Sequence, residues 1–274
     1  MTADLPIREF AFVDKERLED FLSPLLGGMP FQQRETSEED GARTTAGLDV
    51  KLASVQRIGD KQRASWEEIR NATPASLFDV LVQELRQRGA IQELTAFDAE
   101  IWEQLAEGEF VLAPCQVQFS ALERLFDMFQ TYSQMMAILS PQDVAQTDVK
   151  RMLDYLNLLS EQQDSVNIRC IPSGGPSQRH IFVGSLDKRH VRVSKTTLEG
   201  KFQVFGRVQH KLARSESFDL FSLMPPGLRL SREQLRDLLG RFSDTPAVLG
   251  AAPRMEDLRV SYPAIVVTMV AVFR

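Results

Sequence analysis

Apolar residues recur at helical spacing in several segments of the first 160 residues. Asp14, the Thr73-Pro74 pair and Ser120 each precede such a segment and suit a helix start. A shorter helix is expected around 97–106. A second long periodic segment follows Ser140-Pro141, so the chain from 119 to 160 predicts an αα-hairpin. The apolar positions of its two helices are Leu122, Leu125, Phe126, Phe129, Tyr132 and Met136, then Val149, Met152, Leu153, Leu156 and Leu159.

Beyond residue 164 the pattern changes from helical to alternating. Residues 202–212 alternate most clearly, because Phe202, Val204, Gly206, Val208, His210 and Leu212 fall on one face. Residues 264–273 are apolar on both faces, which predicts a fully buried strand. A capping box at Ser231 and Gln234 predicts one further helix. Strands are expected at 166–171, 179–184, 202–212, 218–224 and 264–273, and earlier in the chain at 7–13, 46–58 and 109–118.

The segment 185–200, SLDKRHVRVSKTTLEG, permits two interpretations. It is a helix if Ser185 caps it and Gly200 ends it, which produces the β-α-β-β-α-β order of a ferredoxin-like domain. Alternatively, the alternation around Val191 and Val193 indicates a strand, and the domain is then a meander with one helix. We favour the helix. The predicted fold class is therefore α+β, with a helix-rich N-terminal region and a ferredoxin-like C-terminal domain.

Charge divides the chain at about the same place. Residues 1–164 hold 15 Lys and Arg against 29 Asp and Glu, a net charge of −14, whereas residues 165–274 hold 17 against 9, a net charge of +8. This change of sign predicts two units, an acidic α-rich region at 1–163 and a basic α+β sandwich domain at 164–274. The basic part is either a surface that docks on the acidic part or a surface for an anionic ligand.

The sequence contains no established catalytic motif: there is no Walker A, G-x-G-x-x-G, G-x-S-x-G, H-E-x-x-H or C-x-x-C pattern. Cys115 and Cys170 stand alone, as expected of buried thiols in a reducing compartment. We expect no catalytic residue, no metal and no cofactor, and we lean against an enzyme. The start, MTADLPIREFAF, lacks the basic and apolar regions of a signal peptide, and no run of about 18 apolar residues occurs. A cytoplasmic location without membrane contact is expected.

A basic cluster at 165–214 is the strongest chemical signal. It holds ten Lys and Arg, opposed only by Asp187 and Glu199, and the three histidines of the chain, His180, His190 and His210, lie within it. Lysine and arginine at this density neutralise phosphates. The candidate ligand-binding residues are Arg179, His180, Lys188, Arg189, Arg192 and Arg207.

Several stretches resemble an uncharacterised bacterial protein family, a domain of unknown function of about this length. They are IREFAFVDKERLEDFLSPLLGG, TPASLFDVLVQELRQRGAI, FQVFGRVQHKL and YPAIVVTMVAVFR. The similarity covers most of the chain, and these motifs are mainly structural. The resemblance implies an intracellular bacterial origin and assigns no activity or functional residue.

Two functions follow as expectations. The first is a non-catalytic cytosolic binding or regulatory protein that associates with itself or acts within a larger complex, since oppositely charged regions favour association. The alternative is a sensor or effector that binds an anionic nucleotide or nucleic acid through the basic 165–214 segment, with phage defence as one setting.

Overall fold

The computed structural model describes residues 8–26, 72–95, 97–139, 164–173, 180–223, 254 and 256–274, together with 233 and 236. Its contacts group into two units. One comprises Met1–Phe12 and Gln92–Arg274, and the other comprises Val13–Ile91. Each unit is described by itself below.

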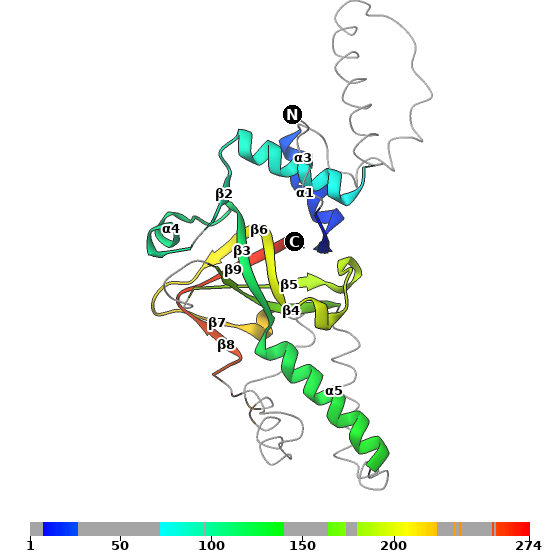
Figure 1. The fold of residues 1–274 in the computed structure, drawn as a ribbon. Coiled ribbons are helices and arrows are strands. Elements are labelled where there is room, and N and C mark those ends of the chain that lie inside the picture. Colours follow the sequence, from blue (N-terminus) through cyan, green and yellow to red (C-terminus); the bar gives the residue numbers. More distant parts are fainter. Residues whose placement is uncertain are drawn as a thin grey trace, which may run out of the picture. The chain divides into compact units, whose positions relative to one another are not determined.

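Five strands of the larger unit close into a barrel (Figure 1). They are β3 (Phe110–Phe119), β4 (Ser165–Pro172), β5 (Ile181–Asp187), β6 (Gly200–Lys211) and β9 (Ala264–Phe273). β3 pairs with both β4 and β6, and β9 pairs with both β5 and β6, so the ring has no open edge. The β5–β9 pair is parallel and the others are antiparallel. Numbered along the chain, the ring order is 1-2-3-5-4-1, which is the order of the five-stranded Greek-key barrel called the OB fold.

The predicted fold class is therefore wrong. The described residues are mostly β, with four α-helices, and the strands form a barrel rather than a ferredoxin-like sheet. The segment 185–200 explains the error. After β5 it makes two short 3-10 turns, η2 (Lys188–His190) and η3 (Lys195–Thr197), instead of a crossover helix. Asp187 caps the first turn, and the Val191 backbone then bridges to Phe12. A helix in the ferredoxin-like position would have been needed to cover one face of an open sheet, whereas a closed barrel buries that face by itself.

The barrel interior holds the main apolar core. Alternate residues of each strand point inward, among them Val117, Ile168, Phe182, Val204 and Val267. The space is narrow, because a Cβ on Gly184 would lie 2.5 Å from the Val267 carbonyl oxygen, and one on Gly206 would lie 2.5 Å from the Thr268 carbonyl oxygen. Glycine at these two positions lets the backbones approach closely.

A second apolar cluster covers part of the barrel's outer surface. Helix α5 (Ala121–Leu139) supplies Leu122, Leu125, Phe126 and Met128, which pack with Val183 of β5 and Val266 of β9. The small sheet of β7 (Ser217–Asp219) and β8 (Arg259–Ser261), with the 3-10 turn η4 (Leu220–Leu223), completes this layer. The expected strand at 218–224 therefore stops early, because the Asp219 carboxylate caps the Phe221 amide and starts the turn.

Shorter elements border the barrel. Strand β1 (Phe10–Val13) lies beside β9, β2 (Ile91–Glu93) lies beside β3, and α4 (Ala99–Gln104) follows β2. Lys211 holds the end of α4, since its Nζ donates to the carbonyl oxygens of Trp102, Glu103 and Leu105. None of the helices in the described ranges combines the length and apolar character needed to cross a bilayer.

The smaller unit contains a helix pair. In α1 (Lys15–Leu25) Asp14 accepts from the Arg17 amide, and in α3 (Pro74–Gln87) Thr73 accepts from the Ser76 amide, as the capping signals predict. The two helices pack together. Their buried faces are the predicted ones: Leu18 and Leu22 on α1, and Leu77, Phe78, Leu81, Val82 and Leu85 on α3.

Other predicted elements are confirmed or lie outside the described residues. The strands expected at 166–171, 202–212 and 264–273 are β4, β6 and β9, and the first hairpin helix is α5. The second hairpin helix and the strand at 46–58 fall in ranges that the structure does not describe. Of the helix expected after Ser231, only Glu233 and Arg236 are described, and both are helical. The predicted face of β6 is interrupted, because the β6–β9 register shifts between Phe205 and Gly206 and between Val208 and His210.

Candidate functional site

The first turn of α5 is fastened to β4 by a capping box. The Ser120 Oγ accepts a hydrogen bond from the Glu123 amide at 3.2 Å, as in an ordinary S-x-x-E box. The Glu123 carboxylate, however, does not return to the Ser120 amide. Its Oε2 accepts from the Asn167 amide at 3.2 Å, while the Ser120 amide donates to the Asn167 carbonyl at 2.9 Å. Both backbone groups of Asn167 thus hold the N-terminus of the helix.

Lys195 links the 188–199 connection to the same helix. Its Nζ donates to Glu123 Oε1 at 2.6 Å and also binds the Asp127 carboxylate, and it lies 5.1 Å from the centre of the Phe119 ring. Glu123 is 3% exposed, so its charge depends on this partner. Partial burial by itself would lower the pKa of Lys195, but the hydrogen bonds that its ammonium donates to Asp127 and Glu123 raise that pKa on balance. The ammonium therefore stays charged and serves as a clamp.

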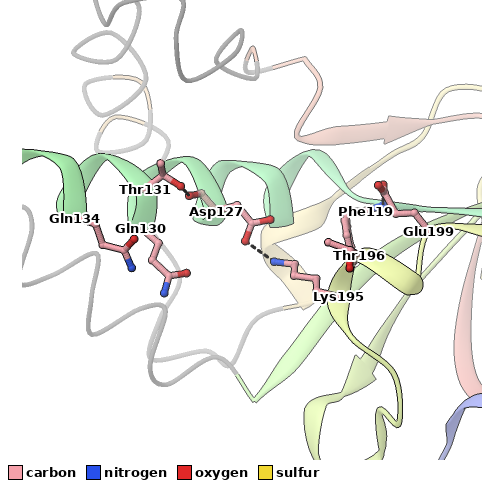
Figure 2. Close-up of a pocket in the computed structure, with 8 residues that line it drawn as sticks. All are labelled: Phe119, Asp127, Gln130, Thr131, Gln134, Lys195, Thr196 and Glu199. Carbon is pink, nitrogen blue, oxygen red and sulfur yellow. Dashed lines mark hydrogen bonds and ion pairs between the residues drawn. The ribbon is translucent and has the colours of Figure 1, made fainter.

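Two adjoining hollows lie between α5 and the 188–199 connection, with volumes of about 460 and about 370 Å³. We call them together the α5 hollow. Figure 2 shows Gln130 and Gln134 on the same side of α5 as Asp127, which reaches Lys195. Thr131 and Thr196 also line the hollow. Its apolar lining consists of Phe119, Phe126, Val166, Val191, Val193 and Leu198. The hollow therefore offers neutral hydrogen-bonding groups beside apolar ones, and the charged residues Lys188 and Glu199 also line it.

The outer face of β4 holds unpartnered polar atoms. Among the described residues, the buried side-chain atoms Asn167 Oδ1, Asn167 Nδ2 and Arg169 Nε lack a hydrogen-bond partner. Asn167 is 0% exposed, and Arg169 is half-buried. Burial lowers the pKa of Arg169, and the nearby charge of Arg124 lowers it further. Buried polar groups are normally satisfied, so this face is an exception within the molecule.

His180 lies in an aromatic cluster at the start of β5. Its ring centre is 5.0 Å from that of Phe97 and 5.1 Å from that of Trp102, and Tyr262 makes an edge contact with Trp102. Burial lowers the pKa of His180, and the charge of Asp98 offsets this in part. The packing identifies His180 as a neutral member of the cluster that borders the barrel core.

His210 lies between two carboxylates at the end of β6. Its Nδ1 is 2.7 Å from Glu107 Oε1, and its Nε2 is 2.7 Å from Glu216 Oε1. The hydrogen bonds to Glu216 and Glu107 raise the pKa of His210. The second register shift in β6 turns His210 from the apolar face assigned by its alternation to this half-exposed position. In the part of the chain that the structure describes, no group of three or more His, Cys, Asp and Glu side chains is placed to hold a metal.

The six predicted ligand residues occupy several places. Lys188, Arg189 and Arg192 lie on the connection after β5, and Lys188 lines the α5 hollow. Arg189 forms a two-nitrogen ion pair with Asp187 at 2.7 to 3.2 Å. His180 lies at the opposite end of β5, roughly 20 Å away at the rise of an extended strand. Arg207 is on β6, where its Nε donates to the Gly108 carbonyl. Arg179 falls outside the described residues.

The two cysteines are buried side by side in the barrel wall. Burial raises the pKa of both thiols, and for Cys170 the neighbouring Cys115 adds to the effect. Neither is a thiolate near neutral pH, so neither can act as a nucleophile there.

One family profile matches residues 7–273, almost the whole chain. It is described as Domain of unknown function (DUF6414). The chain belongs to this family. The expected membership in an uncharacterised family of about this length is therefore confirmed. No curated protein and no solved structure matches the sequence. The function of this DUF6414 chain has to be argued from its own side chains.

Sequence reasoning about this DUF6414 chain missed Glu123, Asp127 and Lys195. A signal was present for the first two, because S-x-x-E at 120–123 marks a capping box and Glu123 and Asp127 are four residues apart on one helix face. Lys195 carried no local signal, since it lies 72 residues from Glu123. Arg169 belonged to the basic cluster, but only the fold shows that it lies on β4 and has no partner among the described residues.

Proposed function

We propose that this DUF6414 protein is a non-catalytic binding protein, and that a polypeptide partner docks in the α5 hollow. The observation that carries the proposal is the lining of the hollow. Amide and hydroxyl side chains at Gln130, Thr131, Gln134 and Thr196 stand beside an apolar surface. Amides and hydroxyls suit the donors and acceptors of a polypeptide backbone, and the apolar residues suit one or two partner side chains.

The chemistry of the nearby charged groups supports binding over catalysis. Lys195 is a charged ammonium held by Glu123 and Asp127, which leaves it no lone pair for nucleophilic attack. The Glu123 carboxylate accepts hydrogen bonds from the Lys195 ammonium and from the backbone N–H of Asn167. These contacts fix Glu123, Asp127 and Lys195 in place beside the hollow.

The outer face of the barrel supports a polypeptide over an oligonucleotide. OB-fold barrels bind oligonucleotides across their second and third strands, where exposed aromatic rings stack on bases. In this chain those strands are β4 and β5, and α5 packs over Val183 on that face. The outward residues of β3 and β4 include Gln116, Gln118 and Arg169, which offer no ring for stacking.

Site-specific photo-crosslinking tests the proposal. A photoreactive residue is placed at Gln130, inside the α5 hollow, or at Gln209, an exposed position on β6 that serves as the matched control. The Gln130 position is expected to crosslink one defined polypeptide, either a second copy or another protein, and the Gln209 position is not. Light scattering of the purified chain over a salt series separates the two partners, since self-association raises the mass without additions.

A blocking substitution completes the test. Thr196→Arg places a long charged side chain in the hollow and is expected to abolish the Gln130 crosslink, whereas Gln209→Arg leaves it intact. Equal crosslinking at both positions, or crosslinking that survives Thr196→Arg, contradicts a docking site in the hollow.

A further inference from the structure

The outer face of β4 carries two consecutive polar side chains without partners. Val166, Ile168 and Cys170 point into the barrel core, so Asn167 and Arg169 point outward. The Asn167 side chain is fully buried, and neither its Oδ1 nor its Nδ2 has a hydrogen-bond partner among the described residues. The buried Nε of Arg169 also has none. An unmatched buried polar atom costs free energy, and three on one strand face indicate that something absent from the bare chain completes them.

The charge at this face is also unbalanced. Arg124 lies one residue beyond Glu123 on α5 and is close enough to Arg169 for their charges to repel. Its ion-pair partner is Glu199, whose Oε1 is 3.8 Å from Arg124 Nη2 and also accepts from the Phe119 amide at 3.1 Å. Glu123 and Asp127 bind Lys195 instead. No carboxylate among the described residues pairs with Arg169.

We propose that Arg169 and Arg124 bind an oxyanion, the phosphate or carboxylate group of a small ligand, on the outer face of β4 beside the first turn of α5. A guanidinium matches such a group with two parallel hydrogen bonds, and a second guanidinium adds a further charge-assisted bond. The side-chain amide of Asn167 lies two residues before Arg169 on the same face, buried and without a partner among the described residues. Gln118, paired in register with Arg169 on β3, stands on the other side.

This site is independent of the α5 hollow and of the proposed polypeptide partner. It keeps the expectation of an anionic ligand but assigns the ligand to Arg169, which lies in the basic 165–214 segment, and to Arg124, which lies outside it. Neither residue is among the six candidates predicted from the sequence. The two proposals therefore fail separately, since crosslinking at Gln130 reports on one and anion binding at Arg169 reports on the other.

Thermal unfolding of the full chain with inorganic phosphate or acetate tests the site, with chloride adjusted to keep the ionic strength constant. The variants are Arg169→Gln and Arg124→Gln. The matched control is Arg254→Gln, an exposed arginine paired with Glu256. Phosphate is expected to raise the midpoint of the wild type and of Arg254→Gln in a saturable manner. Apparent affinity is expected to fall roughly tenfold or more in Arg169→Gln and less in Arg124→Gln, since Arg124 is 60% exposed.

The two anions distinguish the ligand sources. A shift with both assigns a general oxyanion site, and a shift with phosphate alone assigns a phosphate ligand. The proposal is overturned if neither anion shifts the wild type, or if phosphate shifts Arg169→Gln as much as the control. If Arg169→Gln does not fold, the exposed Arg124→Gln variant decides: unchanged phosphate affinity there rejects the site.

Discussion

The two sides of helix α5 differ in how their charges are matched. Toward the 188–199 connection, Lys195 joins the carboxylates of Glu123 and Asp127, and Glu123 also accepts a hydrogen bond from the backbone N–H of Asn167. Toward β4, Arg169 is half-buried without a partner among the described residues, and Arg124 lies beside it. One helix therefore borders a completed ionic contact and an incomplete one. The completed contact explains how the helix is held, and the incomplete one indicates where a ligand is missing.

The largest expected effect comes from detaching α5 from the barrel, which disrupts both sides together. Leu125 is buried in the cluster between α5 and the outer faces of β5 and β9. Leu125→Ala is expected to lower the free energy of unfolding by about 3 kcal/mol, because the cavity adds to the lost apolar burial. Urea denaturation measures the change. Gln134→Ala, an exposed position on the same helix, serves as control and should change stability little; similar losses in both variants would contradict this packing.

The next effect breaks only the completed contact. Lys195→Met leaves the buried Glu123 carboxylate without its cation and is expected to cost about 2 kcal/mol, less than for a fully buried pair because Lys195 is 37% exposed and solvent screens it. The control is Lys188→Met, a neighbouring lysine that also lines the hollow. Adding Glu123→Gln to Lys195→Met should restore part of the loss in the same urea titration. A double variant with a lower free energy of unfolding than Lys195→Met would show that the Glu123 carboxylate is not stabilised by Lys195.

A smaller effect of opposite sign is expected on the incomplete side. Asn167→Leu replaces an unpartnered amide with an apolar side chain of similar size, so stability in anion-poor buffer should rise by about 1 kcal/mol. Added phosphate should then stabilise this variant less than the wild type. A loss of stability in anion-poor buffer would show that the amide is already satisfied, for instance by ordered water. Gln118→Leu, on the neighbouring strand, is the control and should change stability little.

The smallest effect concerns His210, which lies away from both sides. Contacts with Glu216 and Glu107 raise its folded pKa, so its contribution to stability is complete below the unfolded value of about 6.5 and is lost as pH rises through the higher folded pKa. A neutral imidazole has one N–H, so one of its two carboxylate contacts is then lost. The stability difference between wild type and His210→Gln should shrink with rising pH. A difference that is constant over this range would show that His210 does not titrate between these carboxylates, and Gln209→Ala controls for local changes.

The strands and helices were largely predictable, but their arrangement was not. Period-two alternation located β4, β6 and β9, and helical spacing with caps located α1, α3 and α5. The failure lay in 185–200, where local propensity permitted a helix or a strand and the fold uses two 3-10 turns. The described candidate ligand residues lie in several places. Lys188 does line the α5 hollow, yet Arg189 is paired with Asp187 and His180 is packed among aromatic rings.

The sequence by itself determined most of the residues that face a core, because side-chain periodicity is a local property of the backbone. The exceptions lie in β6, where two register shifts bury Phe205 and leave His210 half-exposed. Only the tertiary structure decided that β3 and β9 each pair with two neighbours and close a barrel, since strand pairing joins segments distant in the chain. The same holds for charge. The sequence shows a basic segment, but whether a given arginine has a partner depends on contacts across many residues. Lys195 meets a carboxylate 72 residues away, whereas Arg169 meets none among the described residues.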